Sequence, residues 1–140
     1  MRVNLYPPAV IRIRKDSGGF GYARGPYVSL PVDHSAHQLP HELHHVKQWW
    51  MVTLLSAVAL YALQYYVAFL PLEVIGLSVG VMGMLTRLSK TFRFATEASA
   101  YRVSTKVSPD RIDQFAKMLY DYNTGRTLEQ CRAALGLDRD

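Results

Sequence analysis

The chain has 140 residues and a mass of 15.9 kDa, which allows one domain and leaves no room for a second folded core. Apolar residues make up 49% of the chain and charged residues 19%, a balance that excludes a disordered tail. The single cysteine, Cys131, excludes an internal disulfide framework. The net charge of +5 is dispersed along the chain, so nucleic acid is not the default partner.

The N-terminal part of the chain has the signals of a small sheet. Residues 9–15 alternate apolar and basic side chains, as the half-exposed strand of a sheet does. Residues 16–19 form a turn signal, and residues 20–30 are a second strand candidate with Gly25 and Pro26 in the middle. Together these segments predict a twisted hairpin or a short edge sheet.

The middle of the chain is predicted to be helical and unusually apolar. Pro40 suits the first turn of a helix over residues 41–50. Residues 51–70 follow, 20 residues without a charge, and a helix of that length spans roughly 30 Å, the thickness of a bilayer core. Pro71 ends this run, and a second apolar run, rich in glycine, occupies residues 72–86. The two runs predict a membrane or membrane-like hairpin. The alternative is a pair of core helices in a soluble domain, covered by a partner.

The C-terminal part is also predicted to be helical, so the whole chain is expected to have an α+β fold. Residues 91–106 have the composition of a helix that ends before Ser108. Either Ser108 or Asp110 is expected to cap the next helix. Thr127 is expected to cap a last short helix, with a glutamate and a glutamine near the position of a capping-box partner.

All five histidines of the chain fall within residues 34–45, and three residues of this window make the pattern H-E-x-x-H: His41, Glu42 and His45. On a helix, residues four apart share a face, so His41 and His45 can both direct imidazole nitrogens at one metal ion. Glu42 is adjacent, where a carboxylate can take a proton from a metal-bound water. The structural alternative is a run of exposed polar residues that binds metal adventitiously.

A catalytic zinc site needs a third protein ligand and an open position for water. Glu97 is the best candidate, because it lies on a predicted helix among small residues that would let this helix approach the histidines closely. Alternatively, Glu97 is a solvated glutamate paired with Arg93 or Arg102. His44 faces away from the histidine pair and is not expected to be a ligand. The remaining candidates for the third ligand are His34, His37, Asp33 and Glu73.

The segment HELHHVKQ at residues 41–48, followed by EASAY at residues 97–101, resembles the gluzincin-type zinc metallopeptidases. Many small bacterial and phage members of that group have HExxHxxQ and then a helix with ExxAY. The resemblance covers roughly residues 20–125. It implies one zincin-like domain over residues 1–140, in which an N-terminal hairpin or short sheet, an HExxH helix and C-terminal helices accompany an apolar hairpin insert at about 51–86.

The resemblance also implies roles for individual residues. His41, His45 and Glu97 would bind Zn²⁺, and Glu42 would be the general base that activates a zinc-bound water, whose pKa the ion lowers toward ~7, for hydrolysis of a peptide bond. Peptides or proteins are the implied substrates. One position departs from the family pattern. Many gluzincins have an aspartate four residues after the glutamate ligand, which orients a metal histidine, and here that residue is Tyr101.

The metal site and the apolar hairpin constrain each other. If the two histidines and Glu97 hold one ion, the chain between them must return to the same side of any membrane. A hairpin that turns at Pro71 satisfies this condition, with arms of about 51–70 and 72–92; a tilted, shallow or re-entrant hairpin fits the short second arm. The apolar insert could instead pack against a hydrophobic protein partner. Basic residues flank both ends and predict a metal site at the cytoplasmic face: Lys47, Arg87, Lys90 and Arg93.

Two other functions are compatible with the sequence. The first is a non-enzymatic membrane or assembly protein, in which the histidine window is structural or binds metal without catalysis. The second is a nucleic-acid binder that uses the basic N-terminal segment, where residues 18–22 resemble an aromatic RNA-binding strand. The usual basic residue before the glycine is missing from that strand, so no nucleic-acid partner is expected.

Overall fold

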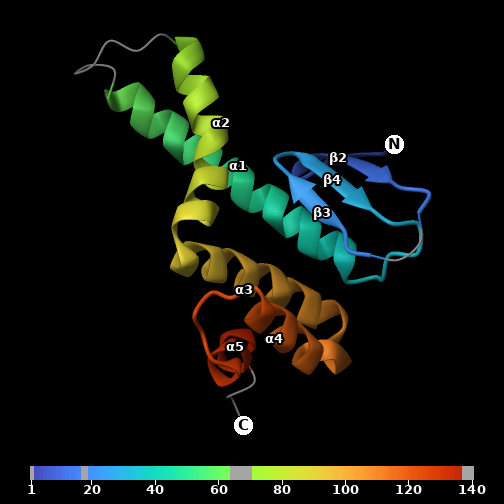
Figure 1. Ribbon diagram of the computed structural model, residues 1–140. Helices are drawn as coiled ribbons and strands as arrows, with labels where there is room; N and C mark the ends of the chain where they lie inside the picture. The colour runs from blue at the N-terminus through green and yellow to red at the C-terminus, as the bar shows by residue number, and fades with distance from the viewer. Residues whose placement is uncertain (1, 17–18, 64–70, 137–140) are drawn as a thin grey trace.

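The computed structural model describes residues 2–16, 19–63 and 71–136 and has a mixed α+β fold that is mostly helical. These residues form four short strands in one sheet, five α-helices and one short 3-10 helix. The sheet packs on the N-terminal half of the first helix, and the last two helices lie below the third (Figure 1). The predicted α+β class is confirmed.

The sheet has the strand order β1-β2-β4-β3, which makes β1 and β3 its edge strands. β1 and β2 are antiparallel, and so are β3 and β4, whereas β2 and β4 are parallel, with Val10 opposite Tyr27. The strands are β1 Arg2–Leu5, β2 Pro8–Ile13, β3 Tyr22–Arg24 and β4 Tyr27–Leu30.

The sequence predicted this sheet only in part. The strand predicted at residues 9–15 is β2, but the single strand predicted at residues 20–30 is wrong, because the chain reverses at Gly25 and Pro26. Gly25 has a φ of 58°, a left-handed conformation that glycine adopts without steric cost. The reversal brings β4 back beside β2, so a parallel pair replaces the predicted hairpin. β1 is a further strand that the alternation pattern did not indicate.

One face of the sheet packs against α1, which runs as a single helix over Gln38–Leu63. The helix predicted over residues 41–50 and the start of the apolar run are therefore one element, and residues 64–70 lie outside the described residues. The indole Nε1 of Trp50 donates a hydrogen bond of 2.9 Å to the carbonyl oxygen of Pro8 and ties α1 to the sheet. The buried core of this contact consists of Ala9, Ile11, Val28, Leu30 and Val46.

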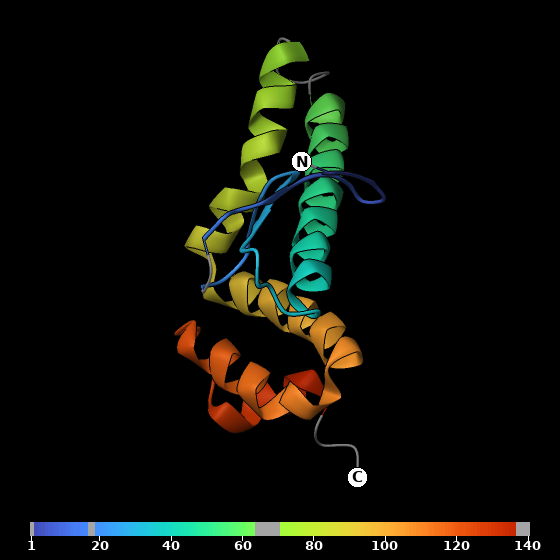
Figure 2. The same ribbon diagram turned by 90° about the vertical axis from the view of Figure 1, so that its right-hand side faces the viewer.

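α2 spans Pro71–Leu88 and runs back beside α1, so that the two helices form a hairpin that rises above the rest of the molecule (Figure 2). α2 begins at Pro71, the residue at which the turn was predicted, whereas the end of the predicted first arm at residues 64–70 lies outside the described residues. The predicted second arm, 72–92, is too long, because α2 ends at Leu88 and a new helix begins. Ser89 is the cap of that helix, and its hydroxyl accepts a hydrogen bond of 3.1 Å from the backbone N–H of Phe92.

Much of the hairpin surface is apolar and exposed. α1 is long and apolar enough to cross a membrane by length and composition, and 17% of its most apolar 18-residue window is buried. In α2 the apolar stretch, Gly76–Leu88, is shorter. An exposed apolar surface of this kind is typical of a membrane or protein contact. The large apolar side chains that are more than half exposed here are Met51, Leu54, Leu55, Val58, Tyr61, Leu77, Met84 and Leu88.

The C-terminal helices are α3 Lys90–Val107, the 3-10 helix Pro109–Arg111, α4 Ile112–Asp121 and α5 Leu128–Leu135. The predicted capping box of α5 is confirmed, because Thr127 and Gln130 exchange hydrogen bonds between side chain and backbone. The predicted cap of α4 is wrong. The 3-10 helix intervenes, and the residue at the N-cap position is Arg111, which makes no side-chain cap.

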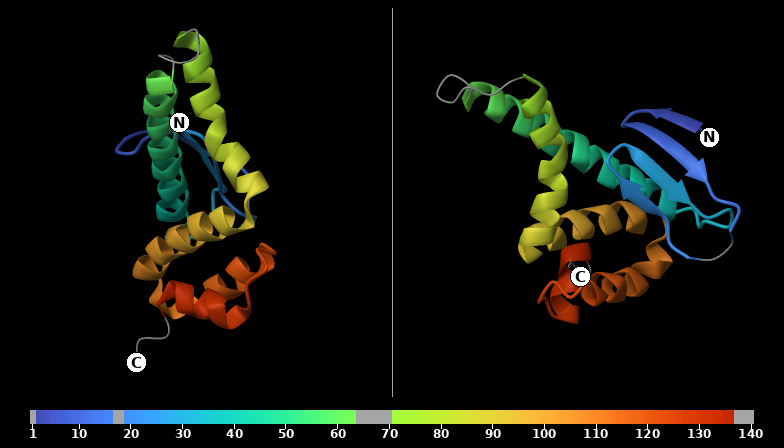
Figure 3. Two further views of the ribbon diagram at one scale, coloured as in Figure 1. Left: turned by 90° about the vertical axis from the view of Figure 1, so that its left-hand side faces the viewer. Right: turned by 45° about the horizontal axis from the view of Figure 1, so that its top comes forward.

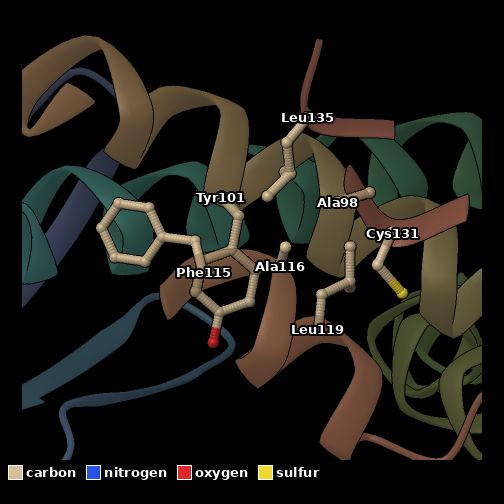
Figure 4. Close-up of a cluster of buried hydrophobic side chains, with 7 residues drawn as sticks. All are labelled: Ala98, Tyr101, Phe115, Ala116, Leu119, Cys131 and Leu135. Atoms are coloured by element: carbon tan, nitrogen blue, oxygen red, sulfur yellow. The ribbon is translucent and has the colours of Figure 1, made fainter. Parts of the chain in front are cut away.

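Buried side chains from α3, α4 and α5 form a second core (Figure 4). α3 therefore packs against the hairpin on one side and against α4 and α5 on the other (Figure 3). This double packing fixes the helix that crosses α1. The members of the second core are Ala98, Tyr101, Phe115, Ala116, Leu119, Cys131 and Leu135.

Candidate metal centre

Three residues predicted as metal ligands meet where α1 and α3 cross. His41 and His45 lie on successive turns of α1, and Glu97 faces them from α3. The Nε2 atoms of the two histidines are 3.2 Å apart. Glu97 Oε2 lies 3.4 Å from His45 Nε2 and 3.9 Å from His41 Nε2. One potential ligand atom from each residue thus lies within 4.8 Å of the others, close enough for all three to hold one ion.

Among the described residues, the side-chain partners of the Glu97 carboxylate are the two histidines. Burial lowers the pKa of His45 while its contact with Glu97 raises it, with a net upward shift. The Glu97 side chain is 15% exposed, and apart from the histidine nitrogens its Oε2 atom has no hydrogen-bond donor among the described residues. No ion pair joins Glu97 to Arg93 or Arg102 in this part of the chain. A buried carboxylate oxygen left in this way is costly unless a cation neutralises it. Two imidazoles and such a carboxylate fit a divalent metal ion, and their chemistry suits zinc.

Gln48 fixes the orientation of His45. The amide Nε2 of Gln48 donates a hydrogen bond of 3.0 Å to the carbonyl oxygen of Thr96 and also lies 2.6 Å from Ser99 Oγ, both on α3. Its Oε1 is therefore left to accept from His45 Nδ1, which is 2.9 Å away. With the proton on Nδ1, the lone pair of His45 Nε2 is available to a metal ion.

His41 is oriented from α3. Its Nδ1 lies 3.3 Å from the hydroxyl of Ser104, and that hydroxyl donates to the carbonyl oxygen of Ala100, so it accepts from the ring. Burial, followed by the neighbouring His45, lowers the pKa of His41 to about 3. The imidazole is therefore neutral at physiological pH, and neutral imidazole is the form that binds metal.

Tyr101 does not replace the orienting aspartate that many gluzincins have at this position. Its ring packs against His41, with centroids 4.5 Å apart, and stacks on Phe115 in the second core, with centroids 5.5 Å apart. Gln48 and Ser104 provide the hydrogen bonds to the metal-facing histidines instead. Both rings are thus held without a carboxylate at residue 101.

Glu42 lies beside the three ligand candidates and is 7% exposed. Burial raises the pKa of Glu42 to about 7, with His45 opposing the shift and Glu97 adding to it. The side chain lies against Gly21, where an added Cβ atom would come within 3.3 Å of Glu42 Cγ. A carboxyl group that titrates near neutral pH can accept and donate a proton, as general acid–base catalysis requires.

The other residues considered from the sequence as third ligands lie outside this group. The ring nitrogens of His34 and His37 make hydrogen bonds within their own loop. His44 points to Ser99 Oγ, 3.2 Å away, and does not join the group, as expected. The candidates that do not join a metal-ligand group in the described residues are His34, His37, His44, Asp33 and Glu73.

Two clefts reach the site, and both are lined by Gly21, His41, Glu42 and Tyr122. The wide cleft, about 790 Å³, lies between β3, α2 and the N-terminal part of α3. The narrow cleft, about 200 Å³, lies between the loop before α1 and the start of α4. A substrate that crosses the metal-ligand group would therefore occupy both.

Tyr122 is a candidate functional residue that sequence reasoning missed. It follows α4 directly and belongs to no motif, so only its place in the fold brings it to the site. Burial, followed by the charge of Glu97, raises the pKa of Tyr122 to about 12, so the phenol keeps its proton. Arg93 lies over its ring, 5.1 Å from the centroid.

Comparison of the chain with protein-family models, with curated proteins and with solved structures gave no match. The geometry of the site is therefore the basis on which a function is assigned. That geometry combines three convergent ligand atoms, a buried carboxyl group beside them and a phenol where the two clefts meet.

We expect the purified protein to bind about one zinc ion per chain, and the Glu97→Ala variant to lose this ion or bind it much more weakly, because one of three protein ligands is removed. Elemental analysis after zinc supply and dialysis measures both. Glu129→Ala, which changes an exposed acid on α5, is the matched control and should keep the parent's zinc content. The absence of stoichiometric zinc from the parent protein would contradict the site.

Proposed function

We propose that this protein is a small zinc metallopeptidase of the gluzincin type, which hydrolyses peptide bonds with Glu42 as the general base. One observation carries the proposal: His41 and His45 converge on Glu97, whose buried Oε2 atom has no hydrogen-bond donor other than these histidines among the described residues. Structural zinc sites are usually closed by four protein ligands, whereas catalytic sites have three and keep one position open. Three candidate ligands meet within the described residues, and this number supports a site of the second kind.

Glu42 is placed to manage the protons of the reaction. A zinc ion held by the three ligands would supply Lewis acidity to the attacking water and to the substrate carbonyl. Glu42 lines both clefts beside the ligands, so its carboxylate can take a proton from that water as the attack begins. The protonated carboxyl group then donates to the leaving amine, which restores the carboxylate for the next cycle.

Tyr122 is the donor best placed to stabilise the negative charge that develops on the carbonyl oxygen. It lines both clefts together with His41 and Glu42. A phenol that keeps its proton donates a hydrogen bond, and such a donor acts most strongly where water is largely excluded. Tyr122 belongs to neither metal-binding helix, so it can be changed without removing a ligand.

The arrangement of elements supports a zincin-like fold as part of this proposal. The edge strand β3 borders the wide cleft, α1 carries the two histidines beneath the sheet, and α3 carries the third ligand. The apolar hairpin consists of the C-terminal half of α1 together with α2, and it is then an insertion between the histidine-bearing turns of α1 and the start of α3.

We further propose that the hairpin associates with a membrane and that the metal site lies at its cytoplasmic face. The exposed apolar surface of α1 begins at Met51, after the site residues on the same helix, so the site would lie at the membrane surface. Lys47, Arg87 and Lys90 flank the base of the hairpin, as the positive-inside rule requires for a cytoplasmic base. A hydrophobic protein partner that covers the same surface is the alternative.

A second candidate function is a non-enzymatic membrane or assembly protein with a structural or degenerate metal site. The exposed apolar surface of the hairpin favours it, because that surface can serve an assembly without any reaction. Hydrolysis by the zinc-loaded protein distinguishes the two candidates.

The Glu42→Gln variant is expected to bind zinc as the parent does and to lose ~10²-fold or more of its hydrolytic rate, because the amide cannot accept the proton of the water. Cleavage of an unfolded protein substrate, followed by mass spectrometry, measures the rate, and Glu129→Gln is the matched control. Full activity in Glu42→Gln would rule out the mechanism. An inactive, zinc-loaded parent protein would favour the second candidate.

The Tyr122→Phe variant is expected to lower kcat by ~100-fold while KM changes little, because a donor to the transition state is lost and substrate contacts are kept. Tyr120→Phe, which changes a tyrosine that is 50% exposed and lines neither cleft, should leave both constants unchanged. An unchanged kcat in Tyr122→Phe would remove Tyr122 from the mechanism.

The parent protein is expected to stay with the membrane fraction after a high-salt wash, and a variant with Leu54→Lys and Val58→Lys to become soluble, because charges on this surface oppose insertion. Leu128→Lys is the control, because the Leu128 side chain is exposed and lies on α5, away from the hairpin. A cysteine introduced by Lys106→Cys should react with a membrane-impermeant maleimide only after the cells are lysed. A soluble parent protein, or labelling of intact cells, would contradict the proposed location.

A further inference from the structure

Three arginines from three different elements line the wide cleft around the metal-ligand group: Arg24 on β3, Arg87 on α2 and Arg93 on α3. Their side chains are exposed, which places the charges at the rim of the cleft. The acidic residues that line this cleft are Glu42 and Glu97, and both already have roles at the metal. The rim of the wide cleft is therefore strongly basic.

These three guanidinium groups are not neutralised by the protein. Within residues 2–16, 19–63 and 71–136, none of them forms an ion pair with a carboxylate. Arg24 lies 5.3 Å from the centre of the Tyr22 ring, and Arg93 packs on Tyr122. A guanidinium group over an aromatic ring still directs its N–H donors outward along its plane, where a carboxylate can accept two of them.

We infer that the wide cleft binds acidic peptide segments, so that the preferred substrates carry aspartate or glutamate close to the bond that is cleaved. The inference rests on the proposed peptidase function and adds the substrate class. A carboxylate on either side of a peptide chain that crosses the cleft would meet at least one of the three arginines. Long-range attraction to the basic rim would also speed the encounter with such a chain.

The position of the arginines favours a peptide over an anionic lipid headgroup. All three line one cleft together with the metal-ligand group, and Arg24 and Arg93 pack over aromatic rings that line the same cleft. Arg87 also flanks the base of the hairpin, so the test includes anionic lipid vesicles. The α2 wall of the cleft also leaves room for a chain, since a Cβ atom added at Gly80 or Gly83 would have nothing within 4 Å.

The test measures binding separately from hydrolysis. Zinc-loaded Glu42→Gln protein in neutral detergent is titrated with a short peptide rich in Asp and Glu that carries a neutral fluorophore. The same peptide with Asn and Gln in their place is titrated beside it, and anisotropy gives Kd. The acidic peptide is expected to bind about tenfold more tightly at low salt, and the difference should shrink as salt rises, because the paired charges are exposed.

Single substitutions then locate the effect. Arg87→Gln and Arg93→Gln are each expected to weaken binding of the acidic peptide about twofold to threefold, while binding of the amide peptide is unchanged. Arg132→Gln removes an arginine of α5 that pairs with Asp113 away from the cleft, and it should change neither Kd. These side chains are exposed, so the variants are expected to fold as the parent does.

The outcomes separate this inference from the proposed function. Equal affinity for the two peptides overturns the acidic preference even if the parent protein hydrolyses peptides. Arginine-dependent binding to anionic lipid vesicles, with no difference between the peptides, assigns the basic rim to a membrane and also overturns it. A preference for the acidic peptide in a protein that never hydrolyses it upholds the basic cleft as a binding site for acidic peptides and refutes the peptidase.

Discussion

The architecture of this protein depends on one contact, the crossing of α1 and α3. Here the amide of Gln48 bridges from α1 to the backbone of α3 at Thr96, and the same crossing buries Glu97 against two imidazoles. An amide bridge this short requires small side chains on α3, and Ser99 and Ala100 provide them. The crossing has a cost, because Glu97 Oε2 lacks a donor in the described residues. Binding of a cation at this crossing would therefore be thermodynamically linked to folding.

The same crossing joins the two cores of the molecule. Val46, next to His45 in the chain, is fully buried against the sheet, whereas Tyr101, one turn beyond Glu97, is buried among the C-terminal helices. The candidate ligand atoms thus lie where the two cores meet. Each histidine ring is oriented by a hydrogen bond from one of its nitrogens. This explains how the site keeps its geometry although residue 101 is a tyrosine. The groups that orient the two histidines are thus an amide, from Gln48, and a hydroxyl, from Ser104.

The parts of this site that the sequence predicted are those set by local rules. The four-residue spacing of His41 and His45 follows from helix geometry, and Glu97 stood out because of its small neighbours. The strand predicted at residues 20–30 was wrong because its reversal at Gly25 is decided by pairing with β2, a contact between distant segments. Tyr122 and the rim arginines escaped prediction for the same reason. They belong to separate elements, and only the packing of α4, β3 and α2 brings them to one cleft.

The place of the hairpin in the chain has a further consequence for the site. Because the hairpin lies in the chain between the histidine-bearing turns of α1 and the start of α3, α2 returns along the cleft before the chain reaches Glu97. Its residues Gly80 and Gly83 form part of the cleft wall. Other residues of the hairpin, which do not line the cleft, carry exposed apolar side chains, as Leu54 and Val58 do. The same two helices therefore carry exposed apolar side chains, which favour contact with a membrane or a protein, and also residues that line the cleft beside the metal-ligand group.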